Sequence, residues 1–331
     1  MSVTAAKGFT AAGVVAGIKA SGKPDLALVV NTGPLAHAAG VFTTNRFTAA
    51  PVVWSKKAIA DGRLAAVVLN SGGANACTGD AGYADTVQTA EWVAAEVGCD
   101  INDVAVCSTG LIGVRLPMDA VLNGIELAAQ DQSSAGGPSA AEAIMTTDTV
   151  AKEAAHRSPK GWSVGGMAKG AGMLAPALAT MLVVITTDAT LSSAELDAAL
   201  RTATAASFDR TDSDGCMSTN DTVLLLASGA SGVQADIDEF TEALTGICTD
   251  LAHQLLSDAE GSAHDIEILV TGALNEDEAL VVARAIARSN LFKCAIFGND
   301  PNWGRVLASA GTVAATYDPE HVDVAFNGVT V

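Results

Sequence analysis

The sequence predicts an α/β protein, and three observations support this fold class. Apolar residues make up 49% of the 331 residues and charged residues only 17%, so the chain can bury a substantial core. Short runs rich in Val, Leu and Ile alternate with alanine-rich stretches of helical periodicity. Helix starts carry capping chemistry, because Ser192 precedes Glu195 by three positions, the spacing of a capping box.

Strands and helices can be placed in order along the chain. Each predicted strand is a short run of β-branched and other apolar residues, and these runs cover residues 26–30, 65–70, 104–107, 181–186, 222–227, 266–270 and 292–297. Each predicted helix repeats its apolar residues at helical spacing, and these stretches cover residues 83–97, 118–130, 139–145, 193–206, 236–257 and 277–289. The polar run 130–137 predicts an exposed loop.

The chain is strongly acidic. It has 18 Lys and Arg against 37 Asp and Glu, which gives a formal net charge of −19. Such a chain repels phosphate backbones and anionic lipid surfaces, so nucleic acid and membranes are disfavoured as partners. On this interpretation the charge keeps the protein soluble and does not serve a particular cationic partner.

Several features predict a cytoplasmic protein. The longest nearly apolar run, residues 173–185, contains Pro176 and Thr180 and is shorter than the roughly 20 residues that a membrane-spanning helix needs. The N-terminus has no basic region followed by an apolar stretch and a cleavage site. The six cysteines are scattered without a Cys-x-x-Cys pair, so we expect reduced and mostly buried thiols.

The most unusual composition lies in residues 164–179, an apolar segment with four glycines in nine residues. Glycines in such a segment predict backbone that is buried or closely approached by other atoms. Residues 170–175 formally match the dinucleotide fingerprint G-x-G-x-x-A, but we expect no strand before them. Pro176 also stands where the crossover helix should run. We therefore assign no nucleotide site to this segment.

Other familiar sites are not supported by the sequence. The five histidines show no metal-ligand spacing, and we expect no bound metal. Residues 210–215 resemble half of a calcium loop, but Arg210 stands at the first ligand position. Cys107, in Cys-Ser-Thr-Gly after a predicted strand, stands where a nucleophile could lie. Because no base is identified for it, we favour a buried structural thiol.

A threonine nucleophile needs no histidine when its own α-amino group serves as the base. A free α-amine titrates at about 7.7–8.0 and can accept the hydroxyl proton near cellular pH. Cleavage between Ala179 and Thr180 would create such a threonine, and the glycines before it permit strained backbone geometry. The residues alone leave another interpretation open, in which Thr180 simply begins a strand.

The run Lys169-Gly-Ala-Gly-Met-Leu-Ala-Pro-Ala-Leu-Ala-Thr180-Met-Leu resembles the self-cleavage segment of the ornithine acetyltransferase family, the bifunctional glutamate N-acetyltransferases of arginine biosynthesis. Further blocks resemble this family in the same order, to about Gly328. They are Gly17-Ile-Lys-Ala-Ser-Gly22, Val41-Phe-Thr-Thr-Asn45, Asn70-Ser-Gly-Gly-Ala-Asn-Ala-Cys77, Cys107-Ser-Thr-Gly-Leu-Ile-Gly113, Ile144-Met-Thr-Thr-Asp148, Ser218-Thr-Asn-Asp-Thr222, Asp258-Ala-Glu-Gly261 and Phe297-Gly-Asn-Asp-Pro-Asn-Trp-Gly-Arg305. Each block is a weak signal, but the ordered set is specific.

The resemblance implies an N-terminal-nucleophile-like fold of the ornithine acetyltransferase type, with mixed sheets packed with helices. It implies cleavage between Ala179 and Thr180 into an α chain of residues 1–179 and a β chain of residues 180–331. Thr180 would be the nucleophile, and Thr109 and Gly110 would form the oxyanion hole. A hydroxyl and a backbone N–H aimed at one point suit that task.

Three further residues match substrate-contacting positions of the family, namely Thr146, Lys169 and Glu260. Lys169 would meet a substrate carboxylate, and Glu260 would meet an ammonium group. Thr180 would also contact the substrate. Without the resemblance we would interpret Lys169 and Glu260 as solvated charges and Thr146 as a hydroxyl at a helix end.

The activity that the resemblance implies is ping-pong transfer of an acetyl group from N2-acetyl-L-ornithine to L-glutamate through an acetyl-threonine. No cofactor is expected, although some relatives also use acetyl-CoA as the donor. The expected assembly is a heterotetramer of two α and two β chains. Relatives continue past the position of Val331 with a tail whose Asn and Thr or Ser close the substrate site, and we expect this sequence to lack it. The run Ser262-Ala-His-Asp265 also replaces the basic residues usual there.

Two alternatives differ from this hypothesis in what happens to the acyl group. An N-terminal-nucleophile amidase or aminopeptidase would use water as the acceptor. A truncated, uncleaved and non-catalytic relative would bind an amino acid without turning it over. Acetyl transfer to glutamate, as opposed to plain hydrolysis, would distinguish the acetyltransferase from the first alternative. A single uncut chain that still binds ornithine or glutamate would support the second.

Overall fold

The computed structural model describes residues 2–173 and 181–331, which form two compact units. The first unit ends at Glu260, and the second spans Gly261–Val331. Each unit has its own buried apolar core. This division separates folded units and does not test the predicted cleavage, because Ala179 and Thr180 lie outside the described residues.

The first unit contains two mixed sheets. Sheet A has the order β1-β2-β4-β5, and these strands span Phe9–Val14, Leu26–Asn31, Ala66–Asn70 and Val104–Ser108 respectively. Sheet B has the order β3-β9-β8-β7-β6, with strands at His37–Phe42, Thr222–Ala227, Leu182–Thr187, Ser163–Lys169 and Lys152–Arg157. The pairs β4–β5 and β8–β9 are parallel, and the other neighbours are antiparallel.

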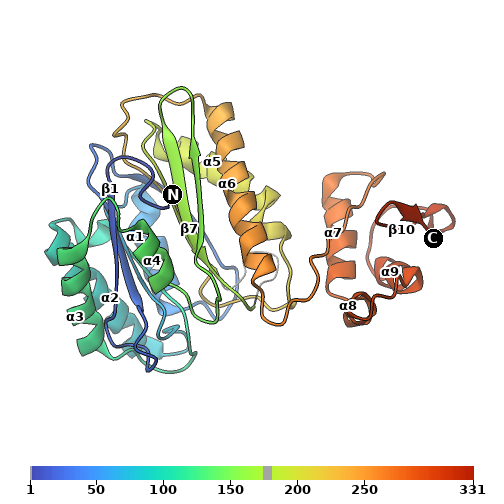
Figure 1. Cartoon of the computed structure of the whole chain (residues 1–331), viewed down its shortest axis with the longest axis horizontal. Coiled ribbons are helices and arrows are strands. Elements are labelled where there is room, and N and C mark those ends of the chain that lie inside the picture. Colours follow the sequence, from blue (N-terminus) through green and yellow to red (C-terminus); the bar gives the residue numbers. More distant parts are fainter. Residues whose placement is uncertain (1, 174–180) are drawn as a thin grey trace. The chain divides into compact units, whose positions relative to one another are not determined.

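The helices of the first unit pack on the faces and along the edges of these sheets (Figure 1). They are α1 (Ala50–Ala58), α2 (Gly79–Val97), α3 (Met118–Asp131), α4 (Gly137–Ala143), α5 (Ser193–Ala206) and α6 (Ile237–Ser257). Helices α2 and α3 pack on sheet A, whereas α5 and α6 pack on sheet B. The predicted capping box at the start of α5 is confirmed, since Ser192 Oγ accepts the Glu195 N–H and Glu195 accepts the Ser192 N–H.

The inner faces of the two sheets share one core. Successive residues of a strand point to opposite sides, and the central strands of sheet B follow this rule. Val184 and Leu224 join the core shared with sheet A, whereas Val183 and Val223 pack under α5 and α6. The first unit is therefore a four-layer arrangement of helices, sheet, sheet and helices. The predicted α/β class with mixed sheets packed with helices is confirmed.

Strand β5 lies at the edge of sheet A, and α1 occupies its free backbone groups. Trp54 Nε1 donates to the Val104 carbonyl at 3.0 Å. Ser55 Oγ donates to the Val106 carbonyl at 2.7 Å and accepts the Val106 N–H at 2.9 Å. These bonds satisfy an edge that would otherwise be open for pairing, and they hold the strand that leads to Thr109.

Residues 164–171 of the glycine-rich segment are buried, as predicted, but those up to Lys169 are themselves part of a strand. A Cβ on Gly165 would lie 2.2 Å from the Ser2 carbonyl oxygen, and one on Gly166 would lie 3.1 Å from Leu251. The expectation that no strand precedes Gly170 is wrong, because β7 ends at Lys169. Strand β7 nevertheless runs antiparallel to β8, so the two do not form the parallel βαβ unit of a dinucleotide site.

The second unit contains α7 (Glu276–Ala287), α8 (Asn290–Phe297), α9 (Trp303–Ala310) and the short paired strands β10 (Ala325–Phe326) and β11 (Val329–Thr330). Two strand predictions are wrong here. Residues 292–297 form most of α8, whose start is capped by Ser289 and whose Phe292 and Ala295 are buried at helical spacing. Residues 266–270 pair with no strand among the described residues. A short apolar run cannot distinguish a helix from a strand, and a strand needs a partner.

The other predicted elements are confirmed within a few residues, but the predictions omit β1, β3, β6, β7, β10, β11, α1 and α9. Strands β1, β3 and β7 are rich in Ala and Gly, which have low strand propensity. They become strands because neighbouring chain segments pair with them. Propensity summed along the sequence does not register that pairing.

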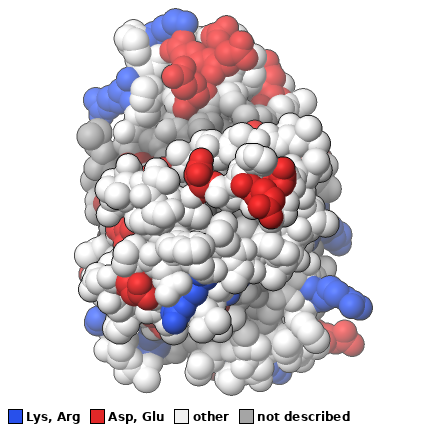
Figure 2. All heavy atoms as spheres, turned by 90° about the vertical axis from the view of Figure 1, so that its right-hand side faces the viewer, with Lys and Arg blue, Asp and Glu red and all other residues white. Residues whose placement is uncertain are grey.

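Surface properties of the chain bear on the remaining predictions. On the face shown in Figure 2, acidic side chains form several separate groups on a largely uncharged surface. Within the described residues, the helices are too short or too polar to cross a bilayer.

The expectation of mostly buried cysteines is wrong: all six are free, but only Cys107 and Cys248 are buried. Cys77, Cys216 and Cys294 are exposed, and Cys99 is half-buried.

Candidate active site

Two of the predicted site residues, Lys169 and Thr109, meet at one end of the two sheets. Lys169 is the last residue of β7 and pairs with Leu182 at the start of β8, and Leu182 pairs with Thr222 at the start of β9. Thr109 follows directly after β5 of sheet A. In sheet B, β7 is antiparallel to β8 and β8 is parallel to β9. The last residue of β7 and the first residues of β8 and β9 therefore lie at the same end of the sheet, beside the loop of Thr109.

The loop after β5 is fixed by polar contacts from two other segments. Asn70 Nδ2 donates to Ser108 Oγ at 2.6 Å, and the Thr109 N–H donates to the Asn70 carbonyl at 3.0 Å. Asn220, just before β9, donates through Nδ2 to the carbonyls of Ser108 and Ala74, both at 2.7 Å. Because these groups are buried, each unmade bond would be costly, so the loop is rigid.

Gly110 is required by this geometry. Its φ of +133° lies in the region that favours glycine, and a Cβ there would come within 2.8 Å of the Gly73 nitrogen. The neighbouring Thr109 is buried and bridges to Gly73. The structure thus places Thr109 and Gly110 together in a tight loop, as the sequence predicts, with backbone close behind Gly110.

Lys169 is fully buried, and its Nζ donates to Thr109 Oγ1 at 3.2 Å. An ammonium group has no lone pair, so the Thr109 oxygen must accept and its own proton remains available to a third partner. Burial lowers the pKa of Lys169 to about 8, although the charge of Asp148 acts in the opposite direction. The interpretation of Lys169 as a solvated charge is therefore wrong.

Thr146 is connected to Lys169 through Asp148. Asp148 Oδ2 accepts the Thr146 N–H at 2.9 Å and lies 3.4 Å from the Thr146 hydroxyl, while Oδ1 accepts the Gly170 N–H at 2.7 Å. Burial acts to raise the pKa of Asp148. The Lys169 charge and the hydrogen bonds from Lys152 and the Thr146 N–H outweigh it and lower this pKa to about 2.

Glu260 lies beside the same glycine-rich segment but on the surface. Its N–H donates to the Ala171 carbonyl at 2.6 Å, and a Cβ on Gly172 would stand 3.4 Å from the Glu260 carboxylate. Its side chain is exposed. Thr109, Lys169, Thr146 and Glu260 are thus joined by short chains of contacts, whereas Thr180 lies outside the described residues.

Sequence reasoning missed Asp221, which binds the backbone of the residue that follows the predicted nucleophile in the chain. Asp221 is fully buried, and its Oδ1 accepts the N–H of Met181, the residue that follows Thr180 in the chain, at 3.1 Å. Burial raises the pKa of Asp221 well above its ordinary value, against the hydrogen bond from Met181. Its position in the block Ser218–Thr222 was the available signal, but a short carboxylate in a polar run gave no hint of burial.

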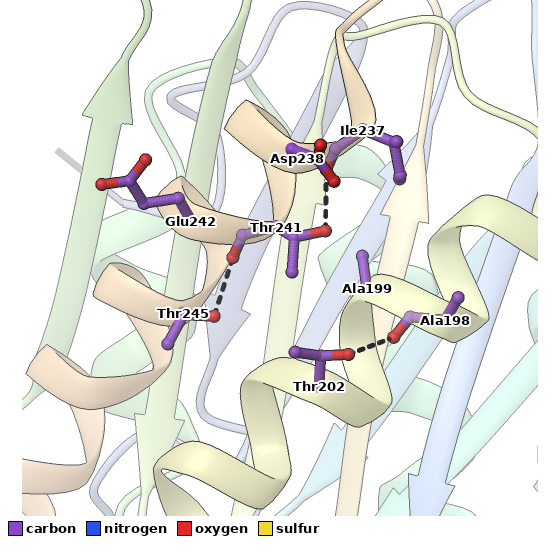
Figure 3. A pocket seen from close by; sticks show the side chains of 8 residues that line it. All are labelled: Ala198, Ala199, Thr202, Ile237, Asp238, Thr241, Glu242 and Thr245. Carbon is purple, nitrogen blue, oxygen red and sulfur yellow. Dashed lines mark hydrogen bonds between the residues drawn. The ribbon is translucent and has the colours of Figure 1, made fainter.

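Three other features were considered as candidate sites: the Cys107 thiol, groups of possible metal ligands, and a depression between α5 and α6. Burial raises the pKa of Cys107 to about 12, which keeps it a protonated thiol, as the structural interpretation predicts. In the two described stretches of chain, no group of three or more His, Cys, Asp or Glu could hold a metal ion. Between α5 and α6 lies an open depression of about 520 Å³, lined by residues that include Thr202, Thr241 and Thr245 (Figure 3). These hydroxyls donate to carbonyls of their own helices.

The ionisation of Lys169 predicts how stability changes with pH. The folded state releases the Lys169 proton at about pH 8, whereas an unfolded lysine keeps it to about 10.5. Between these values the unfolded state binds more protons, so the free energy of unfolding should rise with pH by roughly 3 kcal/mol from this residue. Denaturant unfolding of the wild type and of Lys169→Met, repeated from pH 7 to 10.5, measures this contribution of Lys169 to the free energy of unfolding. A stability difference between the two proteins that does not change with pH would contradict the burial of a charged lysine.

Comparison with known proteins identifies the family. The ArgJ family model matches residues 10–331. The arginine biosynthesis bifunctional protein ArgJ of Streptomyces coelicolor is 63% identical over 331 residues, which are 100% of this chain and 86% of that protein. The protein of the same name from Bifidobacterium longum is 60% identical, with the same two shares covered.

A solved structure agrees with the sequence relatives. The crystal structure of ornithine acetyltransferase from Mycobacterium tuberculosis, complexed with ornithine, is 56% identical and has a TM-score of 0.53. The match covers 55% of this chain and 96% of that one. With identities of this size, and a family model that spans nearly the whole sequence, the chain belongs to the ArgJ family.

Proposed function

We propose that the protein transfers an acetyl group from N2-acetyl-L-ornithine to L-glutamate, releasing ornithine and N-acetylglutamate. Family membership supports an acetyltransferase of arginine biosynthesis. The observation that carries the proposal is the contact between Lys169 and Thr109 at the edge where β8 begins. It places a buried cation at the end of β7 beside a hydroxyl that directly follows β5, and this hydroxyl accepts a hydrogen bond from the cation.

In the proposed mechanism Thr180 is the nucleophile and its α-amine is the base. Thr180 Oγ attacks the acetyl carbonyl, and the hydroxyl proton passes to the α-amine. The Thr109 hydroxyl and the Gly110 N–H donate to the developing oxyanion. The C–N bond then breaks, ornithine leaves with the proton from the ammonium, and an acetyl-threonine ester remains. The glutamate amine attacks this ester, so Thr180 is released and the acetyl group is transferred.

Substrate recognition follows from the surrounding residues. Lys169 supplies a positive charge for the substrate carboxylate, and Glu260 supplies a negative charge for an ammonium group. The Thr146 hydroxyl adds a polar contact on the side of Asp148. The reaction needs no metal or cofactor, since threonine, amine and oxyanion donors account for every bond made and broken. Acetyl-CoA is a second candidate donor. We propose a cytoplasmic location for this reaction.

The α-amine requires prior cleavage between Ala179 and Thr180. We propose that Thr180 attacks the Ala179 carbonyl and that water hydrolyses the resulting ester, with the same oxyanion donors serving both reactions. The α chain would carry β3 and β7, and the β chain would carry β8 and β9. Because β7 pairs with β8 and β3 pairs with β9, the two chains would stay associated through sheet B.

Mass spectrometry tests cleavage and assembly together. We expect two fragments under denaturing conditions, the smaller beginning Thr180-Met-Leu-Val, and a single complex of both under native conditions, with two copies of each chain. One species of 33.2 kDa under denaturing conditions would contradict self-processing.

An acetyl-transfer assay tests the function itself. N2-acetyl-L-ornithine labelled in the acetyl group is incubated with and without glutamate. Labelled N-acetylglutamate is the expected product. Free acetate without transfer to glutamate would favour the amidase, and binding without either product would favour the non-catalytic relative. Replacing the donor with acetyl-CoA shows whether both acetyl sources are used.

A further inference from the structure

We propose that Lys152 is a positioning residue, whose buried ammonium group sets the relative positions of the two arms of the substrate site. One arm is the loop that carries Thr146, and the other is the segment that carries Glu260. The inference rests on the proposed function, because it concerns how that site holds its substrate.

The geometry around Lys152 is that of a buried triad. Lys152 begins β6 and its side chain is completely inaccessible. Its Nζ lies 2.7 Å from Asp148 Oδ1 and 2.6 Å from Asp258 Oδ2, and it also lies 3.3 Å from the Val150 carbonyl. The side chain of Asp148 is inaccessible and that of Asp258 is 8% exposed. One cation therefore joins two carboxylates that are 110 residues apart in the chain.

Asp148 transmits the position of Lys152 to the first arm. The carboxylate that contacts Lys152 also accepts the N–H groups of Thr146 and Gly170. Gly170 follows Lys169 directly, so Asp148 fixes the peptide next to the lysine that meets Thr109. A shift of Asp148 would move both Thr146 and the Lys169–Gly170 peptide.

Asp258 connects Lys152 to the second arm. It follows the last residue of α6, and it accepts the Thr149 N–H at 2.9 Å and the Thr149 hydroxyl. Glu260 stands two residues further on, held to Ala171 through its backbone. The triad thus links the end of α6, the Thr146 loop and the start of β6 at one point.

Stability alone does not account for such an arrangement. Burying three charges carries a desolvation cost that their mutual attraction only offsets when the geometry is good, and apolar replacements are often as stable. Burial acts to raise the pKa of Asp258, but its bonds to Lys152 and Thr149 lower it overall. Both carboxylates are thus held ionised, and their four oxygens give directional bonds that an apolar cluster would lack.

The test is a kinetic comparison of Lys152→Met with wild type, using N2-acetyl-L-ornithine as the varied substrate. A displaced Thr146 and Glu260 should raise KM by about tenfold or more while kcat changes much less, since the triad does not contact the reacting atoms. Lys160→Met is the matched control, because Lys160 forms an exposed ion pair with Glu239 and lies in the turn that joins β6 to β7, at the opposite end of these strands from Lys152 and Lys169. It should keep the wild-type KM.

Asp258→Asn keeps the test decisive if Lys152→Met does not fold. This variant leaves the Lys152–Asp148 pair in place and weakens only the link to the second arm, so a smaller rise in KM is expected. A folded Asp258→Asn or Lys152→Met protein with wild-type KM overturns the inference. Failure of the wild type to transfer acetyl groups would instead refute the proposed function, so the two failures are distinguishable.

Discussion

Replacing Thr180 with alanine is expected to leave the chain in one piece and to abolish acetyl transfer. The proposal uses the Thr180 hydroxyl twice, first to attack the Ala179 carbonyl and then to attack the acetyl group. Without it neither reaction has a nucleophile, and loss of a nucleophile costs an enzyme about four orders of magnitude or more in kcat. Intact mass under denaturing conditions reports the cleavage, and labelled acetylornithine reports the transfer.

Two variants control this experiment. Thr180→Ser keeps the hydroxyl and the α-amine after cleavage, so it should retain both reactions at a reduced rate, because serine lacks the methyl group that restricts the side-chain rotamer. Thr202→Ala removes an exposed threonine of α5 and should behave as wild type. Normal cleavage and transfer by Thr180→Ala would show that the nucleophile is misassigned.

Replacing Thr109 with alanine is expected to lower kcat by a hundred- to thousandfold, roughly 3–4 kcal/mol of transition-state stabilisation. The physical reason is the direction of one hydrogen bond. Because Lys169 Nζ donates to Thr109 Oγ1, the Thr109 proton is left to donate to an oxyanion. The KM for acetylornithine should change less, since the charge on the oxygen develops only in the transition state.

Thr109→Ser is the matched variant, because it keeps a hydroxyl at the same position and the acceptor for Lys169. It should retain most of the wild-type kcat. Rates are compared per cleaved molecule, with the cleaved fraction taken from intact mass, since the same donors are proposed to serve self-cleavage. If Thr109→Ala and Thr109→Ser have equal kcat values, the hydroxyl has no role in the oxyanion hole.

Local sequence patterns predicted many elements of the first unit because their determinants are local. The capping box of Ser192 and Glu195 identifies the start of α5, and the run 222–227 coincides with β9. The same reasoning failed at residues 292–297, where an apolar run forms a helix. It also failed at β7, where Gly165 and Gly166 have low strand propensity although the segment is a strand. In both cases the pairing or packing of the segment decides the outcome, and its composition alone does not.

The candidate site divides in a similar way. Thr109, Gly110, Thr146, Lys169 and Glu260 were named from the sequence through resemblance, and the structure joins them through short contacts. The partnership of Lys152 with Asp148 and Asp258 was not predicted, and neither was the burial of Asp221 with its hydrogen bond from the Met181 N–H. From the sequence alone, a lysine or an aspartate is expected to be exposed to solvent, because such residues are rarely buried without a partner.

Periodicity, capping and ordered motifs are properties of neighbouring residues. The α/β class, most helices and strands of the first unit, and the family of the chain could therefore be predicted from the sequence alone. The charge states of the side chains at the strand ends could not, because they depend on the folded structure. The pKa of Lys169 is lowered to about 8 by burial, and that of Asp148 is lowered to about 2 mainly by Lys169 and by its hydrogen bonds. Desolvation and charge pairing depend on every group packed around a side chain, and here those groups come from segments far apart along the chain.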